Sequence, residues 1–162
     1  MLDKIKSNIN NIISIASIVA IALVTPQLFD YVFEAQDNMI YEVVYIGGLI
    51  IANVLAFLMA YKNKTALLNI IVVVFLGVHI LSYLETVISN DSYYNIPYLA
   101  LYGVALVVYL ISLGNDKVNK LLLVLLLICL CFAALGALSG GAVSLSCTIT
   151  LLIIMSQLYI TK

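Results

Sequence analysis

Apolar residues fill six long segments of this chain, and short polar stretches separate them. The six segments cover residues 9–28, 40–60, 66–88, 95–113, 118–138 and 142–160. Each is close to the roughly 20 apolar residues that a helix needs to cross a hydrocarbon core of about 30 Å. The pattern therefore predicts an all-α integral membrane protein. We expect one domain of six transmembrane helices, arranged as three hairpins.

Composition supports this class of protein. Of the 162 residues, 65% are hydrophobic and 9% are charged, whereas soluble domains have about 45–50% apolar and about 25% charged residues. The lipid bilayer is therefore the first expected partner. No segment is basic enough to indicate binding to nucleic acid.

The lysines predict the orientation. In the six-helix arrangement all basic residues fall on one side: Lys4, Lys6, Lys62, Lys64, Lys117, Lys120 and Lys162. By the positive-inside rule that side is the cytoplasm, so both termini are expected there. The N-terminal stretch resembles a signal peptide, but its apolar run is long and no small-residue cleavage site follows, so we expect an uncleaved first helix. The lack of arginine, with many Asn, Ile and Tyr residues, is typical of an AT-rich genome. We therefore expect a multi-pass protein of a bacterial plasma membrane.

Acidic residues gather on the opposite side. The segment 29–42, "FDYVFEAQDNMIYE", places Asp30, Glu34 and Asp37 on one face if it is helical. It is either a solvated loop anchored by its aromatic residues or a collar that concentrates cations or a basic peptide at the outer face.

The stretch "GVHILSYLE", residues 77–85, contains the only histidine of the chain. His79, Ser82 and Glu85 are each three residues apart, so on a helix they step round by about 60° and span an arc of about 120°. His79 and Glu85 therefore cannot touch directly, and Ser82 or water bridges them if they act together. Because polar side chains inside a bilayer face protein or a water-filled cavity, this stretch marks the protein-facing side of the third helix.

Two other helices offer polar partners for that face. In the fourth segment four tyrosines, the last of them Tyr109, form a stripe that descends from the outer surface. In the second segment Asn53 shares a face with Glu42, which lies near the outer end. These residues either pack with satisfied hydrogen bonds or line an outer cavity. The predicted ligand-binding residues are Glu42, Tyr45, Asn53, His79, Ser82, Glu85, Tyr94, Tyr98 and Tyr102.

Small residues and thiols occur in the last two segments. Gly136 and Gly140 have GxxxG spacing, and Gly141 follows them, so we expect a tight hairpin between the fifth and sixth helices or a contact between subunits. Cys129, Cys131 and Cys147 are expected to pack as buried apolar thiols. A disulfide between Cys131 and Cys147 is feasible, but the spacing does not indicate one.

No enzyme motif is present. The chain has one histidine and no arginine, and it contains no H-E-x-x-H, G-x-S-x-G or P-loop sequence. We therefore expect a non-enzymatic protein without a catalytic residue, a metal site or a cofactor.

Three functions remain open. The first is binding or passage of a small solute or cation from the outer face, because tyrosines and carboxylates suit an organic cation. In topology alone, the chain is similar to the membrane-embedded substrate-binding subunits of energy-coupling-factor vitamin transporters. The second is an immunity or accessory protein that binds a membrane-active toxin, a peptide or a partner membrane protein. The third is a self-associated pore, although no segment has a polar stripe along its whole length.

Overall fold

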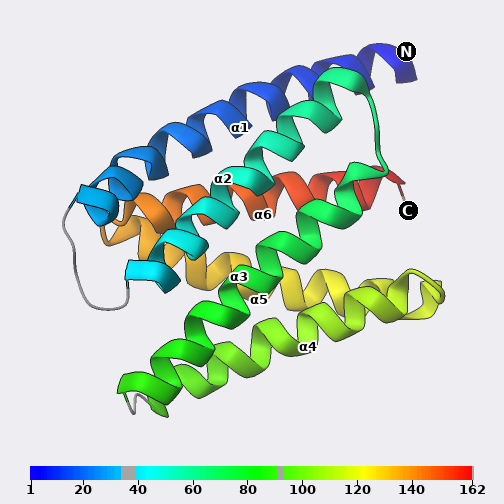
Figure 1. Ribbon diagram of the computed structural model, residues 1–162. Coiled ribbons are helices and arrows are strands. Elements are labelled where there is room, and N and C mark those ends of the chain that lie inside the picture. Colours follow the sequence, from blue (N-terminus) through cyan, green and yellow to red (C-terminus); the bar gives the residue numbers. More distant parts are fainter. Residues whose placement is uncertain (34–38, 91–92, 162) are drawn as a thin grey trace.

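The structure is a computed structural model that describes residues 1–33, 39–90 and 93–161. Its described part is built from helices and the turns between them, as Figure 1 shows. The α-helices are α1 (Leu2–Phe33), α2 (Met39–Lys62), α3 (Leu67–Asn90), α4 (Ile96–Ser112), α5 (Asn119–Leu138) and α6 (Ala142–Thr161), and the short 3₁₀ helices are η1 (Tyr93–Asn95) and η2 (Asp116–Val118). The all-α fold and the six helices are thus confirmed.

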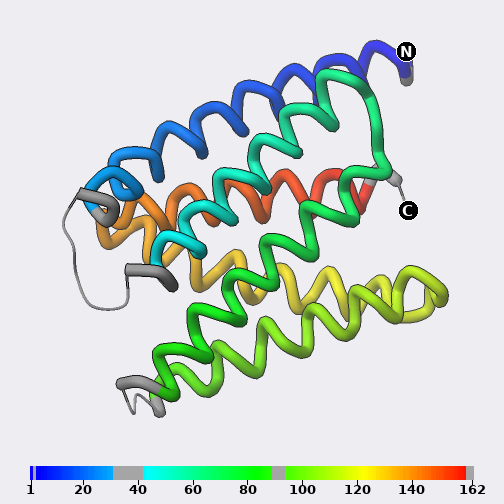
Figure 2. The backbone as a smooth tube through the Cα atoms, in the orientation of Figure 1, coloured from blue at the N-terminus to red at the C-terminus, as the bar shows by residue number. Residues whose placement is uncertain are grey.

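Each helix packs against the next one along the chain, and α1 packs against α6, so the six helices form a closed ring. The three expected hairpins are part of this ring. Figure 2 shows α2 and α3 crossing in front of α6 and α5. Helix α6 also contacts α2 and α3. The position of α6 between α1, α2 and α3 brings side chains together that are far apart in the sequence.

Apolar side chains cover the sides of the bundle. Large exposed residues include Ile12 and Ile15 on α1, Val107 on α4, and Val124 and Leu127 on α5. Five helices are long and apolar enough to cross a membrane, namely α1, α2, α3, α5 and α6, whereas the apolar helix α4 has 17 residues. Pro97 lies in the first turn of α4, where a missing N–H costs little.

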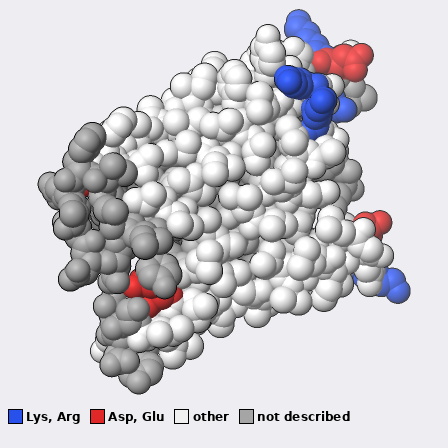
Figure 3. Space-filling view, viewed as in Figure 1, with Lys and Arg blue, Asp and Glu red and all other residues white. Residues whose placement is uncertain are grey.

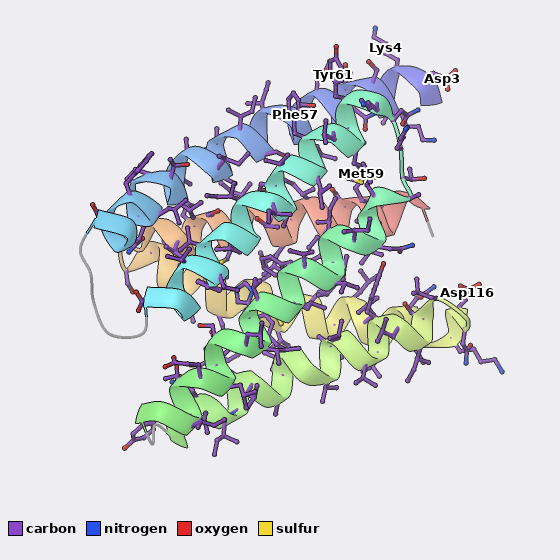
Figure 4. The ribbon with its side chains drawn as sticks, viewed as in Figure 1. Asp3, Lys4, Phe57, Met59, Tyr61 and Asp116 are labelled. Atoms are coloured by element: carbon purple, nitrogen blue, oxygen red, sulfur yellow. The ribbon has the colours of Figure 1, made fainter. Side chains whose placement is uncertain are left out.

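Charges lie at the ends of the bundle. In Figure 3 the lysines form blue patches at one end, separated from the other end by a white apolar surface. Lys4 and Asp116, labelled in Figure 4, mark this end at the start of α1 and in the turn before α5. The opposite end holds Asp30, Glu42 and Glu85. The other acidic residues expected there, Glu34, Asp37 and Asp91, lie outside the described residues, and so does Lys162.

Polar contacts in the interior connect α6 to its neighbours. The Asn53 amide donates hydrogen bonds to the Leu49 carbonyl at 2.9 Å and to the Thr150 hydroxyl at 3.1 Å, which joins α2 to α6. The Ser146 hydroxyl donates to the Ala20 carbonyl at 3.1 Å, which joins α6 to α1. These side chains are fully buried. Each therefore finds inside the protein the partner that a lipid environment cannot supply.

The glycines of the α5–α6 turn have two different roles. Gly136 lies against α6, since a Cβ atom there would stand 2.6 Å from the Ser144 hydroxyl. Gly140 lies beyond the end of α5 and has a φ of +92°. Its N–H bonds the Ala137 carbonyl and the Gly141 N–H bonds the Gly136 carbonyl, which is the Schellman pattern. Gly136 thus lies within α5, where it faces α6, whereas Gly140 lies just beyond the end of α5.

Gly48 marks the closest approach of α2 to α3. A Cβ atom at this position would lie 2.2 Å from a methyl carbon of Val78, whereas a Cβ at Gly47 would meet no atom within 4 Å. We expect Gly48→Ala to lower the free energy of unfolding by about 1–3 kcal/mol because the added methyl forces the helices apart. Gly47→Ala is the matched control and should have no such cost. Reversible unfolding in mixed micelles measures both, and equal stability of the two variants would contradict this packing.

Candidate functional site

A cavity of about 450 Å³ lies between α2, α3, α4, α5 and α6. The lining residues lie in the halves of these helices that are farther from the lysines. The lining residues are Tyr45, His79, Tyr83, Tyr98, Tyr102, Phe132, Ala133, Leu135, Gly136, Ser139, Ser144 and Cys147. The small residues at the α5–α6 turn leave room for this space, and aromatic rings form its walls.

Four of these rings form a stacked ladder between α3 and α4. Tyr98 stacks on Tyr83 with ring centroids 5.6 Å apart, Tyr83 on Tyr102 at 5.5 Å, and Tyr102 on His79 at 4.7 Å. Tyr98 and Tyr102 are four residues apart, and so are His79 and Tyr83, which places each pair on one face of its helix. The two pairs therefore interleave. Phe132 of α5 meets the edge of the ladder at Tyr98, with centroids 5.2 Å apart.

His79 joins the ladder to a group of polar atoms from three helices. Its Nδ1 lies 2.8 Å from the Phe75 carbonyl oxygen, which can only accept, so Nδ1 bears the proton. The other nitrogen, Nε2, therefore presents its lone pair. It lies 3.2 Å from the Tyr45 hydroxyl and 3.4 Å from the Cys147 sulfur. The hydroxyl and the sulfur are 3.5 Å apart, so three polar atoms form a nearly equilateral triangle.

Within the described part of the chain, the cavity lining has polar groups but no charged side chain. Among the residues that the structure describes, the hydroxyl groups of Tyr83, Tyr98 and Tyr102 make no hydrogen bond with protein. They are free to bond a molecule that enters the cavity. Stacking covers both faces of Tyr83 and of Tyr102, so these two rings offer their edges and hydroxyls to a ligand instead of their faces.

Four of the nine predicted ligand-binding residues line this cavity: Tyr45, His79, Tyr98 and Tyr102. The structure therefore brings together the second, third and fourth helices on the faces that the polar residues indicated. His79 is 3% exposed and lies among protein side chains.

The other five predicted residues lie outside the lining. Asn53 is bonded to Thr150, and Tyr94 is 90% exposed. Glu42 and Ser82 are half-buried. Glu85 has one buried carboxylate oxygen without a hydrogen-bond partner, and no contact joins it to His79. Of the three residues His79, Ser82 and Glu85 on the third helix, only His79 lines the cavity.

Tyr83 and Cys147 both contact His79 but were not among the predicted ligand-binding residues. Tyr83 lies within the quoted stretch "GVHILSYLE", and its spacing of four residues from His79 was the available signal. Cys147 had been expected to pack as an apolar thiol, but it is 4% exposed and lies against the histidine. Nothing in the sequence indicated this contact, because the two residues are 68 positions apart. All three cysteines are free; Cys129 and Cys147 are buried as expected, whereas the expectation was wrong for Cys131, which is exposed.

Comparisons of the chain with protein-family models, with curated proteins and with solved structures find no match.

The ladder makes Tyr83 a test of how the site is held together. We expect Tyr83→Leu to lower the free energy of unfolding by about 1–3 kcal/mol, since two stacked ring pairs are lost and each contributes roughly 0.5–1.5 kcal/mol. Tyr83→Phe retains the ring and should remain close to the parent chain. Tyr159→Leu, at a position 80% exposed, is the control for loss of a tyrosine. Comparable stability of the Tyr83→Leu and Tyr83→Phe variants would contradict the stacking.

Proposed function

We propose that this protein crosses the plasma membrane six times, with both termini in the cytoplasm, and binds a small uncharged solute in the aromatic cavity from the outer face. The orientation is supported by the lysines, whose described members all lie at the end opposite to the cavity. α4 has 17 residues, at the lower end of the range for a membrane span.

The observation behind this proposal is the cavity itself. Ligand sites are concave spaces of about 300–1,000 Å³ with apolar walls and a few polar groups that orient the ligand. The cavity of about 450 Å³ has aromatic walls and free tyrosine hydroxyls. A cavity of this kind suits the substrate-binding or membrane subunit of a transporter.

Two observations favour an uncharged solute over the cation that the sequence suggested. Glu42 and Glu85 lie outside the cavity lining, and the described lining residues include no other carboxylate that would compensate a cation. The faces of Tyr83 and Tyr102 are covered by neighbouring rings, so these two tyrosines offer no free face for cation–π binding. The ring edges and hydroxyl groups of these tyrosines remain accessible to a ligand, and the hydroxyl groups suit hydrogen bonding to an uncharged molecule.

The alternative is an immunity or accessory protein, with the acidic segment 29–42 as the surface for a toxin, a peptide or a partner protein. Most of that segment lies outside the described residues. The self-associated pore is less favoured, because the fully buried side chains of Leu49, Phe75, Leu151 and Ile154 fill the interior of the bundle.

A matched pair of probes tests the proposal. Benzyl alcohol and benzylammonium have almost the same shape but differ in charge. We expect benzyl alcohol to bind the purified chain at least about tenfold more tightly, because transfer of an uncompensated charge into the cavity is costly. Saturation-transfer NMR measures both ligands, and equal or tighter binding of benzylammonium would contradict an uncharged ligand.

Ala133→Leu is the blocking variant for this experiment, since Ala133 lines the cavity. It should remove the specific benzyl alcohol signal and leave only partitioning into detergent. Ala137→Leu, one turn farther along α5 and outside the lining, is the control and should bind like the parent chain. If Ala133→Leu also binds like the parent chain, the cavity is not the binding site.

A further inference from the structure

We propose that Cys147, His79 and Tyr45 form a binding site for one soft monovalent metal ion, Cu(I), in the wall of the cavity. This inference goes beyond the proposed solute binding. It uses the same cavity as the route of entry, but it does not require that a solute bind.

The distances within the polar triangle fit a metal ion. Its sides are 3.2 Å from Tyr45 oxygen to His79 Nε2, 3.4 Å from Nε2 to Cys147 sulfur, and 3.5 Å from sulfur to oxygen. An ion bound by these three atoms alone, with a metal–sulfur bond of about 2.3 Å and metal–nitrogen or metal–oxygen bonds of about 2.0–2.2 Å, holds them about 3.6–3.8 Å apart. An ion therefore fits this triangle with adjustments of a few tenths of an ångström. All three residues line the cavity, which leaves a side open for entry.

His79 is held in the form that binds a metal. Its Nδ1–H donates to the Phe75 carbonyl, so Nε2 presents a lone pair to the triangle. Such a bond to the second ring nitrogen fixes the orientation of a ligating histidine and raises its basicity. The Tyr102 ring stacks on the imidazole at 4.7 Å and the Phe75 ring lies 4.4 Å away, so the ring has little freedom to turn. The ligand atoms come from α2, α3 and α6, and hydrogen bonding among them can hold the triangle before an ion arrives.

Charge balance selects a monovalent ion. When the ion binds, the Cys147 S–H bond breaks, a sulfur–copper bond forms, and the displaced proton leaves to water at the cavity mouth. His79 contributes its lone pair and Tyr45 remains a neutral hydroxyl, so the oxidation state of copper does not change. One positive charge replaces another, and the buried site stays neutral. Zn(II) would leave a net positive charge, and the described lining residues include no carboxylate to compensate it, which is costly in a medium of low dielectric constant. Thiolate and imidazole are also ligands that suit Cu(I).

The test uses full-length chain in which Cys129→Ser and Cys131→Ser leave Cys147 as the one thiol. Cu(I) is titrated anaerobically against a chromophoric Cu(I) chelator. We expect one Cu(I) per chain, with a sulfur-to-copper absorption band in the ultraviolet. Adding Cys147→Ser should abolish this binding, and His79→Gln should weaken it at least about tenfold. Tyr45→Phe should weaken it less than His79→Gln does. Zn(II) should bind at least about 100-fold more weakly than Cu(I).

A second measurement needs no substitution at the site. Cu(I) should slow the alkylation of Cys147 by N-ethylmaleimide at least about tenfold in the same background chain. The proposal is overturned if this chain takes up no Cu(I), if Cys147→Ser binds Cu(I) unchanged, or if Zn(II) binds as tightly. Failure of this proposal is distinguishable from failure of solute binding: Cys147→Ser retains the cavity and should still bind benzyl alcohol.

Discussion

The need to satisfy polar side chains inside an apolar bundle is the constraint on which this structure depends. α6 supplies three contacts of this kind: Ser146 bonds α1, Thr150 bonds Asn53 of α2, and Cys147 meets His79 of α3. A rotation of α6 would direct these groups toward the apolar surroundings, where nothing could bond them. The three contacts therefore define the orientation of α6, and through it they close the ring of helices.

The closed ring also determines what the interior can do. Toward the lysine end, the buried side chains of Leu122 and Leu158 border another cavity of about 440 Å³, which Lys120 also lines. Toward the other end, the small residues of the α5–α6 turn and the ring ladder of α3 and α4 leave a cavity. Because the described lining residues carry no charge, the same electrostatic constraint applies to both proposed occupants. A solute has to be uncharged, and a metal ion has to replace a proton of equal charge.

Much of the fold and part of the site could be predicted from the sequence. Apolar segment length predicts the helices, and polar residues indicate their inward faces, as Asn53, His79 and Tyr102 illustrate. Helical geometry does not say which helices meet across a ring, so the contact of Cys147 with His79 could not be predicted. Depth along a helix was a second difficulty. Glu42 and Glu85 lie in the end turns of α2 and α3, beyond the cavity, although they share the helices of its residues.

The central claim is that the cavity opens on the outer, lysine-free side. Site-directed labelling in intact cells tests it most directly, with a membrane-impermeant thiol reagent and a chain whose native cysteines are replaced by serine. Ser139→Cys, in the cavity lining, should react with the reagent added outside. Thr65→Cys, exposed at the lysine end, should react only after the cells are opened. Labelling of Thr65→Cys from outside, with Ser139→Cys protected until the cells are opened, would contradict the account.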